Sequence, residues 1–268
     1  MTIPTLDEIA CRLGTDKSTL TTLPTGHNGF PGSRGSGHAY TVFYEEFFRR
    51  RRDEPVRLLE IGVLDGRSLA MWAEYFSAGH IHGLDLDPSC RQFERDRTRV
   101  FIGSQDDPAV LASVKAAVPE GFDIVIDDGS HYVKHMIASF HGLFEHVTPG
   151  GYYVIEDIST AGVLNWGSES FNRGMALLQD ARGNDPSEMT QFLRDIKARP
   201  DVAELVLHQR AICFIRKRAA GDPASTLYER GGKIEDLFPL PRPLWRRAAG
   251  RFVHWATGRF AYCASFFR

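Results

Sequence analysis

The sequence has no long apolar run and no excess of charge of one sign. Its 32 basic and 34 acidic residues give a net charge of −2, so no overall field favours binding to nucleic acid. No apolar run approaches the ~18 residues that a membrane-spanning helix needs. The amino terminus also lacks the basic and apolar segments of a signal peptide. We therefore expect a cytoplasmic protein that does not bind nucleic acid.

Metal-binding and disulfide patterns of cysteine are absent as well. The four cysteines lie far apart without CxxC spacing, which is typical of reduced thiols rather than of a disulfide framework (Cys11, Cys90, Cys213, Cys263). His131 and His135 are spaced as a zinc pair on one helix face, but no third nitrogen or sulfur ligand follows at a zinc-like spacing. A zinc site is therefore not expected.

The composition is that of a globular protein, with 43% hydrophobic and 25% charged residues among 268. We divide the chain into a helical preface (residues 1–54), a main domain (55–218) and a basic, aromatic tail expected to be helical (219–268). Within the preface, residues 19–37 are rich in Gly, Pro, Ser and Thr. Such a segment is expected to be mobile, either as a lid loop or as disorder.

From Val56 onward, short apolar runs alternate with helical patterns. The expected strands cover residues 56–61, 80–85, 99–102, 122–127 and 151–155, and the expected helices cover residues 5–13, 40–50, 66–77, 89–95, 107–117 and 132–145. Two later apolar runs, 202–207 and 211–215, are close enough to pair as a hairpin. The expected fold is α/β: a Rossmann-like, doubly wound, mainly parallel seven-stranded sheet with an antiparallel terminal hairpin.

Acidic residues follow two of these expected strands. Asp128 comes after the run 122–126, and Glu156 and Asp157 come after Val154-Ile155. The carboxyl ends of neighbouring parallel strands share one crevice, where ligands bind. Three carboxylates there would repel one another without a cation, and hard oxygen ligands suit Mg²⁺. The sequence therefore predicts a magnesium site, with His131 placed to take a proton from a metal-bound group.

A second group of candidate residues follows the first two strands. Glu60, Gly62 and Gly66 form the pattern E-x-G-x-x-x-G, whose glycines let a backbone approach a ligand closely. The acid suits the positively charged methionyl part of S-adenosylmethionine better than a pyrophosphate. Asp85, about 20 residues later, is placed to accept hydrogen bonds from ribose hydroxyls. This pattern favours an adenosine cofactor.

Small polar residues follow the third strand. Ser104 and Gln105 could contact an adenine edge, or the segment could instead cap the helix that begins near Asp107. Both interpretations are open at this point.

Together these motifs resemble the class I S-adenosylmethionine-dependent O-methyltransferases, from about Gly14 to Lys217. Within that superfamily, the motifs 60–68, 83–88, 126–131 and 155–157 are similar to the Mg²⁺-dependent sugar O-methyltransferases of macrolide antibiotic pathways, such as those of mycinamicin and tylosin, and to rhamnosyl O-methyltransferases. Catechol O-methyltransferases carry a lysine three positions after the metal acid. His131 stands there in this chain, which favours the sugar-modifying branch.

The resemblance implies methyl transfer from S-adenosylmethionine to a hydroxyl of a sugar on a natural product or glycolipid. It implies Mg²⁺ on Asp128, Glu156 and Asp157, with His131 as general base. The implied cofactor contacts are Glu60, Gly62, Ser68, Asp85, Ser104, Gln105 and Asp128. The alternatives are a catechol-type O-methyltransferase, an NAD-dependent oxidoreductase, which the missing GxGxxG disfavours, and a non-catalytic adenosine-binding protein.

The last 27 residues, 242–268, hold six arginines and no acidic residue, with six aromatic Trp and Phe residues between them. One interpretation is an amphipathic helix that lies on a membrane or a partner. The other is a helix packed on the domain or on a second subunit of a homo-oligomer.

Overall fold

The computed structural model describes residues 3–19, 37–158, 186–208, 212–223 and 228–231. These residues form two compact units, with the boundary between Ser104 and Gln105. The boundary falls inside the expected main domain of residues 55–218. Each unit contains its own set of paired strands.

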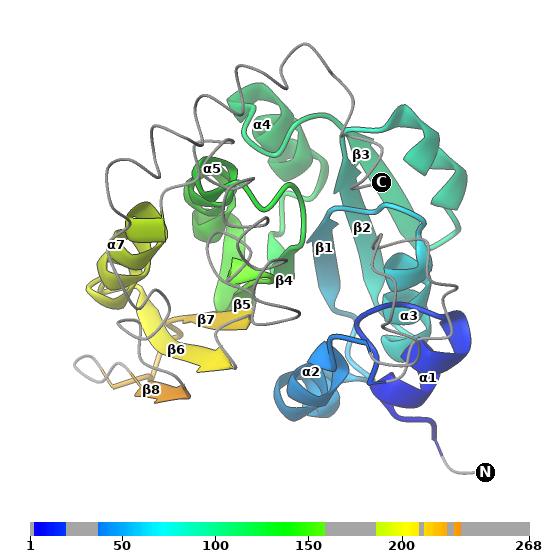
Figure 1. Cartoon of the computed structure of the whole chain (residues 1–268), viewed down its shortest axis with the longest axis horizontal. Coiled ribbons are helices and arrows are strands. Elements are labelled where there is room, and N and C mark those ends of the chain that lie inside the picture. Colours follow the sequence, from blue (N-terminus) through cyan, green and yellow to red (C-terminus); the bar gives the residue numbers. More distant parts are fainter. Residues whose placement is uncertain (1–2, 20–36, 159–185, 209–211, 224–227, 232–268) are drawn as a thin grey trace, which may run out of the picture. The chain divides into compact units, whose positions relative to one another are not determined.

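The first unit is a three-stranded parallel sheet with helices, in which β2 is the middle strand (Figure 1). Its elements are α1 (Leu6–Leu13), α2 (Tyr40–Phe48), the 3-10 helix η1 (Arg49–Arg51), β1 (Arg57–Ile61), α3 (Arg67–Tyr75), β2 (His80–Asp85), the 3-10 helix η2 (Pro88–Phe93) and β3 (Thr98–Ile102). Helix α1 packs against both α2 and α3.

The second unit contains the mixed part of the sheet, in the order β4-β5-β7-β6-β8. Its elements are α4 (Pro108–Ala117), β4 (Phe122–Asp127), α5 (Val133–Leu143), the 3-10 helix η3 (Phe144–His146), β5 (Val147–Ile155), α7 (Pro186–Lys197), β6 (Val202–His208), β7 (Ile212–Lys217) and β8 (Tyr228–Gly231). Strands β4 and β5 are parallel, β7 is antiparallel to β5 and β6, and β8 is parallel to β6.

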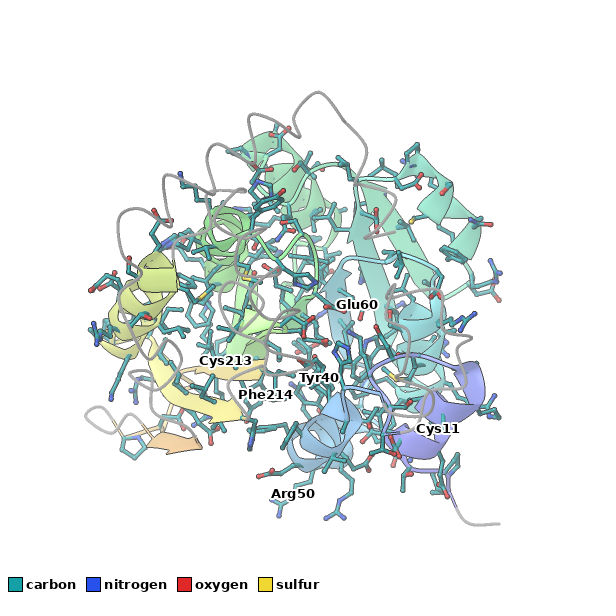
Figure 2. The ribbon with its side chains drawn as sticks, viewed as in Figure 1. Cys11, Tyr40, Arg50, Glu60, Cys213 and Phe214 are labelled. Carbon is teal, nitrogen blue, oxygen red and sulfur yellow. The ribbon has the colours of Figure 1, made fainter. Side chains whose placement is uncertain are left out.

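Local sequence signals explain where several of these elements begin and end. Thr5 and Glu8 form a reciprocal capping box at the start of α1, and Gly14 ends that helix in the left-handed conformation. Asp107 caps α4, which begins with Pro108. All six residues of β4 are buried, and Figure 2 shows Cys213 and Phe214 on β7, both fully buried. An apolar run of this kind is typical of a strand covered on both faces.

The predicted α/β class and the antiparallel terminal hairpin are confirmed. Four details differ from the sequence prediction. β5 begins at Val147 rather than 151, and the expected helix 89–95 is the 3-10 helix η2. Helix α7 was not predicted, and residues 228–231, expected to be helical, form an eighth strand. Strand β8 forms by pairing with β6. This contact joins residues far apart in the chain, so no local sequence pattern predicts it.

Two predictions lie outside the described residues. All but the two end residues of the expected lid or disordered segment, 19–37, fall in the undescribed range 20–36, and the basic tail covers residues 242–268. Among the helices that the structure describes, none has the length and apolar character needed to cross a membrane.

Asp7 connects the two segments of the chain that flank residues 20–36. Its carboxylate accepts hydrogen bonds from the Thr19 backbone N–H at 2.8 Å and from the hydroxyls of Thr19 and Thr41, both at 2.6 Å. The backbone N–H of Ala39 also donates to the Ser18 carbonyl at 3.1 Å. Burial alone would raise the pKa of Asp7, but these hydrogen bonds outweigh it and lower that pKa below its ordinary value of 3.8.

We expect Asp7→Ala to destabilise the protein by about 1–3 kcal/mol, because the buried Thr41 hydroxyl loses its acceptor. Since folding lowers the pKa of Asp7, its contribution is complete above pH 3.8 and is lost as the pH falls through the lower folded value. Urea denaturation of the variant and the parent across this range measures the difference. Asp53→Ala, at an exposed position, is the control and should change stability by less than about 0.5 kcal/mol. An equal effect of both substitutions would contradict the role of Asp7.

Candidate functional site

The turn after β1 depends on two glycines in the left-handed region. Gly62 has φ 91° and donates its N–H to the Leu84 carbonyl at 2.9 Å. Gly66 has φ 73°, and a Cβ at this position would lie 2.4 Å from the Phe93 ring. Glycine is therefore required at 66 for both conformation and space.

Asp85 fixes the same turn from the end of β2. One carboxylate oxygen accepts hydrogen bonds from the backbone N–H groups of Val63 at 2.8 Å and Leu64 at 3.1 Å. The other oxygen accepts from the Asp87 N–H at 2.8 Å. The predicted ribose-binding acid thus also shapes the glycine turn.

Glu60, on β1, is completely buried and carries a set of polar contacts (Figure 2). Its carboxylate accepts hydrogen bonds from the Ser68 hydroxyl at 2.6 Å and the Trp72 indole N–H at 3.3 Å. The Lys17 Nζ lies 3.6 Å away, and its side chain is only 3% exposed. A buried charge is tolerated when it is paired in this way. The predicted cofactor residues Glu60 and Ser68 therefore contact each other.

In the second unit, the structure brings Asp128, His131 and Asp157 together. Each offers one ligand atom, and these atoms all lie within 4.8 Å of one another. The His131 Nε2 is 3.9 Å from both an Asp128 oxygen and an Asp157 oxygen. All three side chains are partly exposed, so a ligand could reach them. We call this set the acid–histidine cluster.

The parallel pairing of β4 with β5 explains the cluster. Asp127 pairs with Ile155, and the Glu156 N–H donates to the Asp127 carbonyl at 2.9 Å. Residues 128 and 157 therefore leave neighbouring strands at the same edge, as the sequence predicted. Glu156, the third predicted metal ligand, is 1% exposed and does not belong to the cluster.

Two members of the cluster have unusual backbones. His131 has φ 55° and Asp157 has φ 52°, in the left-handed region that side chains other than glycine rarely adopt. Such a conformation is costly, and it persists when surrounding contacts fix it. Two such residues in one cluster make it a candidate functional site.

Asp127, the residue before Asp128, is the centre of a buried polar network. This residue is fully buried, and its carboxylate accepts hydrogen bonds from the Gln105 amide at 2.9 Å, from the Tyr153 hydroxyl at 3.2 Å and from the Ser139 hydroxyl. Burial, together with the Asp127 charge, raises the pKa of Tyr153 well above its ordinary value. The network ties α5, β5 and the segment after β3 to the end of β4.

Gln105 makes contacts that the sequence analysis did not predict. Its amide N–H donates to Asp127, and its carbonyl accepts the Ser130 backbone N–H at 2.8 Å. The side chain thus supports the turn that carries the acid–histidine cluster, and an adenine contact stays a prediction. Ser104 and Gln105 belong to different units.

Sequence reasoning missed three residues that build these sites: Lys17, Ser139 and Tyr153. Lys17 lies 43 positions before Glu60, and Ser139 and Tyr153 lie inside a helix and a strand. A serine in a helix interior and a tyrosine in an apolar strand are compatible with many roles. Only the buried residue that such a side chain contacts shows which role it has, and no local sequence pattern reveals that contact.

Comparison with known proteins places these features in a family context. Residues 59–158 match the family described as a methyltransferase domain. The chain is 45% identical over 143 residues to demethylmacrocin O-methyltransferase of Streptomyces fradiae, covering 51% of this chain and 36% of that protein. It is 40% identical over 164 residues to mycinamicin VI 2''-O-methyltransferase of Micromonospora griseorubida, covering 59% and 40%.

The structure is similar to that of MycE, a methyltransferase of the mycinamycin biosynthetic pathway solved with Mg, SAH and mycinamycin VI. The TM-score is 0.60 at 30% identity, and the match covers 83% of this chain and 57% of that one. The chain thus spans less than two thirds of the length of each of these relatives. These findings confirm the predicted resemblance to O-methyltransferases and the predicted fold class.

We expect Tyr153→Phe to destabilise the protein by about 1.5–3 kcal/mol, because the buried Asp127 carboxylate loses a donor. Tyr152→Phe is a matched control on the same strand. The Tyr152 hydroxyl donates to a Glu204 oxygen at 3.4 Å in a half-buried position, so its loss should cost about 0.5 kcal/mol. Thermal and urea denaturation measure both values. Equal effects of the two substitutions would show that the Asp127 network has no special weight.

Proposed function

We propose that this chain, which matches a methyltransferase domain over residues 59–158, transfers a methyl group from S-adenosylmethionine to a sugar hydroxyl with the help of Mg²⁺. The acceptor would be a glycosylated natural product or glycolipid. The acid–histidine cluster is the observation that carries this proposal, because it combines two carboxylates and a base at one sheet edge. The similar proteins named above include sugar-directed O-methyltransferases, which favours this chemistry over hydride transfer.

The cofactor would bind at the glycine turn of the first unit and at the residues that follow. Gly62 leaves space for close approach, and Asp85 can accept hydrogen bonds from ribose hydroxyls while it fixes the turn. Glu60 would face the cationic methionyl end, with Ser68 holding its carboxylate. The remaining proposed contacts are Ser104, Gln105 and Asp128.

The chemistry of the cluster fits Mg²⁺. Asp128 and Asp157 offer carboxylate oxygens, which this ion prefers. Glu156, which is buried and lies outside the cluster, is the third ligand that the family resemblance implies. When bound, Mg²⁺ would lower the pKa of the acceptor hydroxyl and orient it toward the methyl group.

His131 is the proposed general base. Its Nε2 is the ring nitrogen that lies near both carboxylates, at 3.9 Å from each. It would take the proton from the acceptor hydroxyl as that oxygen bonds to the methyl carbon and the sulfonium leaves as S-adenosylhomocysteine. The two carboxylates would stabilise the positive charge that His131 gains.

A second role for His131 follows from the same geometry. Its Nε2 and one carboxylate oxygen each of Asp128 and Asp157 lie within 4.8 Å of one another, so the three side chains could coordinate one metal ion. Imidazole suits Zn²⁺, Ni²⁺ and Fe²⁺ better than Mg²⁺, which prefers oxygen. The base and ligand roles therefore predict different metal affinities for a His131 variant.

We expect methyl transfer to require a divalent cation. The assay uses radiolabelled S-adenosylmethionine with a panel of rhamnosylated and macrolide glycosides and a catechol. Exhaustive treatment with EDTA should abolish turnover, and Mg²⁺ or Mn²⁺ should restore it. Full activity after chelation would exclude the metal role of the cluster. Turnover of the catechol alone would exclude a sugar acceptor.

We expect His131→Ala to lower the single-turnover rate by roughly 10²–10⁴, the usual contribution of a general base. Mn²⁺ and S-adenosylhomocysteine affinities, measured by titration calorimetry, should stay near those of the parent. Lys134→Ala, exposed on α5, is the matched control and should leave the rate unchanged. A large loss of Mn²⁺ affinity in His131→Ala would instead identify His131 as a metal ligand, and a rate loss under about tenfold would contradict the base.

A further inference from the structure

Ser130 is held by several hydrogen bonds in the turn that carries two members of the acid–histidine cluster, Asp128 and His131. It lies between Asp128 and His131, and its backbone N–H donates to the side-chain Oε1 of Gln105 at 2.8 Å. Its hydroxyl oxygen accepts the Tyr132 backbone N–H at 3.3 Å. These two bonds hold the backbone on both sides of His131, whose φ is 55°.

His135 provides a third contact to Ser130, from the first turns of α5. Its Nδ1 lies 2.9 Å from the Ser130 hydroxyl oxygen, and its Nε2 lies 3.3 Å from an Asp106 carboxylate oxygen. A carboxylate only accepts hydrogen bonds, so Asp106 favours the tautomer with the hydrogen on Nε2. The Nδ1 atom is then an acceptor, and the Ser130 hydroxyl donates to it. With this tautomer, the contacts run from Ser130 through His135 to Asp106.

The contacts of Ser130 converge from two adjacent residues of one segment. Gln105 holds the Ser130 backbone directly, and Asp106 holds the Ser130 hydroxyl through His135. Helix α5 is a regular helix whose buried face includes Met136 and Phe140, so it offers a firm support for the imidazole.

We propose that His135 is a positioning residue for the metal site. It holds the Ser130 hydroxyl and thereby keeps Asp128 and His131 in the arrangement that binds the cation. A left-handed backbone at His131 needs such support, because it is intrinsically unfavourable. The inference rests on the proposed function, since it assigns His135 a role in the same site. Removal of a group that orients the ligands of a metal site typically lowers metal affinity or activity by about 10–100-fold.

A purely structural role for His135 makes a different prediction. In that case, loss of the imidazole would lower the stability of the turn and of α5, but a folded variant would bind the cation as the parent does. Metal affinity of the folded protein therefore separates the two roles.

The test measures Mn²⁺ binding to the full chain by electron paramagnetic resonance, without cofactor or acceptor. His135→Asn places an amide group near the position of Nδ1 and keeps the contact to Ser130. His135→Gln places the amide near Nε2 and keeps only the contact to Asp106, and His135→Phe keeps neither. We expect the Phe and Gln variants to weaken Mn²⁺ binding by about tenfold and the Asn variant to restore most of it.

His141→Phe is the matched control, the same substitution at an exposed position of α5, and should leave Mn²⁺ affinity unchanged. Ser130→Ala removes the same contact together with the bond from the Tyr132 N–H, and should lose at least as much affinity. His135→Gln decides the question if His135→Phe does not fold. Parent-like Mn²⁺ affinity in folded His135→Phe or Ser130→Ala would overturn the inference and leave the proposed function intact. Absence of Mn²⁺ binding in the parent would overturn the metal site and this inference with it.

Discussion

The buried carboxylate of Asp127 is the constraint on which the candidate site depends. A charge with no exposed surface must be satisfied by hydrogen bonds, because an unpaired buried charge is strongly destabilising. Gln105, Ser139 and Tyr153 supply those bonds from three different parts of the second unit. The next residue is Asp128. The position of the acid–histidine cluster is therefore fixed by a network that contains none of its three members.

Two pairs of adjacent acidic residues, Asp127–Asp128 and Glu156–Asp157, each contain one buried and one partly exposed side chain. Asp127 and Glu156 are 0% and 1% exposed, whereas the side chains of Asp128 and Asp157 are 25% and 16% exposed. Asp127 is the last residue of β4 and Glu156 directly follows β5, whereas the second acids, Asp128 and Asp157, are partly exposed. Only the second acids, with His131, form the cluster. In the first unit, by contrast, both members of the Lys17–Glu60 pair are buried.

The comparisons and the geometry support the proposed function in different ways. The sequence relatives are named as O-methyltransferases, and the chain spans less than half of their length. The geometry adds what likeness alone cannot: one ligand atom each from a histidine and two carboxylates, all within 4.8 Å, with left-handed backbones at His131 and Asp157. Strain of this kind is maintained only where the surrounding contacts are strong enough to impose it.

The sequence by itself determined the strands β1 to β4 almost to the residue, the helix caps and the placement of acids after β4 and β5. These features depend on apolar periodicity and on capping within a few positions, so they are local. The tertiary structure alone decided which acid of each pair is buried, that Lys17 pairs with Glu60, that Gln105 supports Ser130, and that residues 228–231 pair with β6. These outcomes join residues far apart in the chain, and their energies arise from burial and from polar partners that exist only after folding.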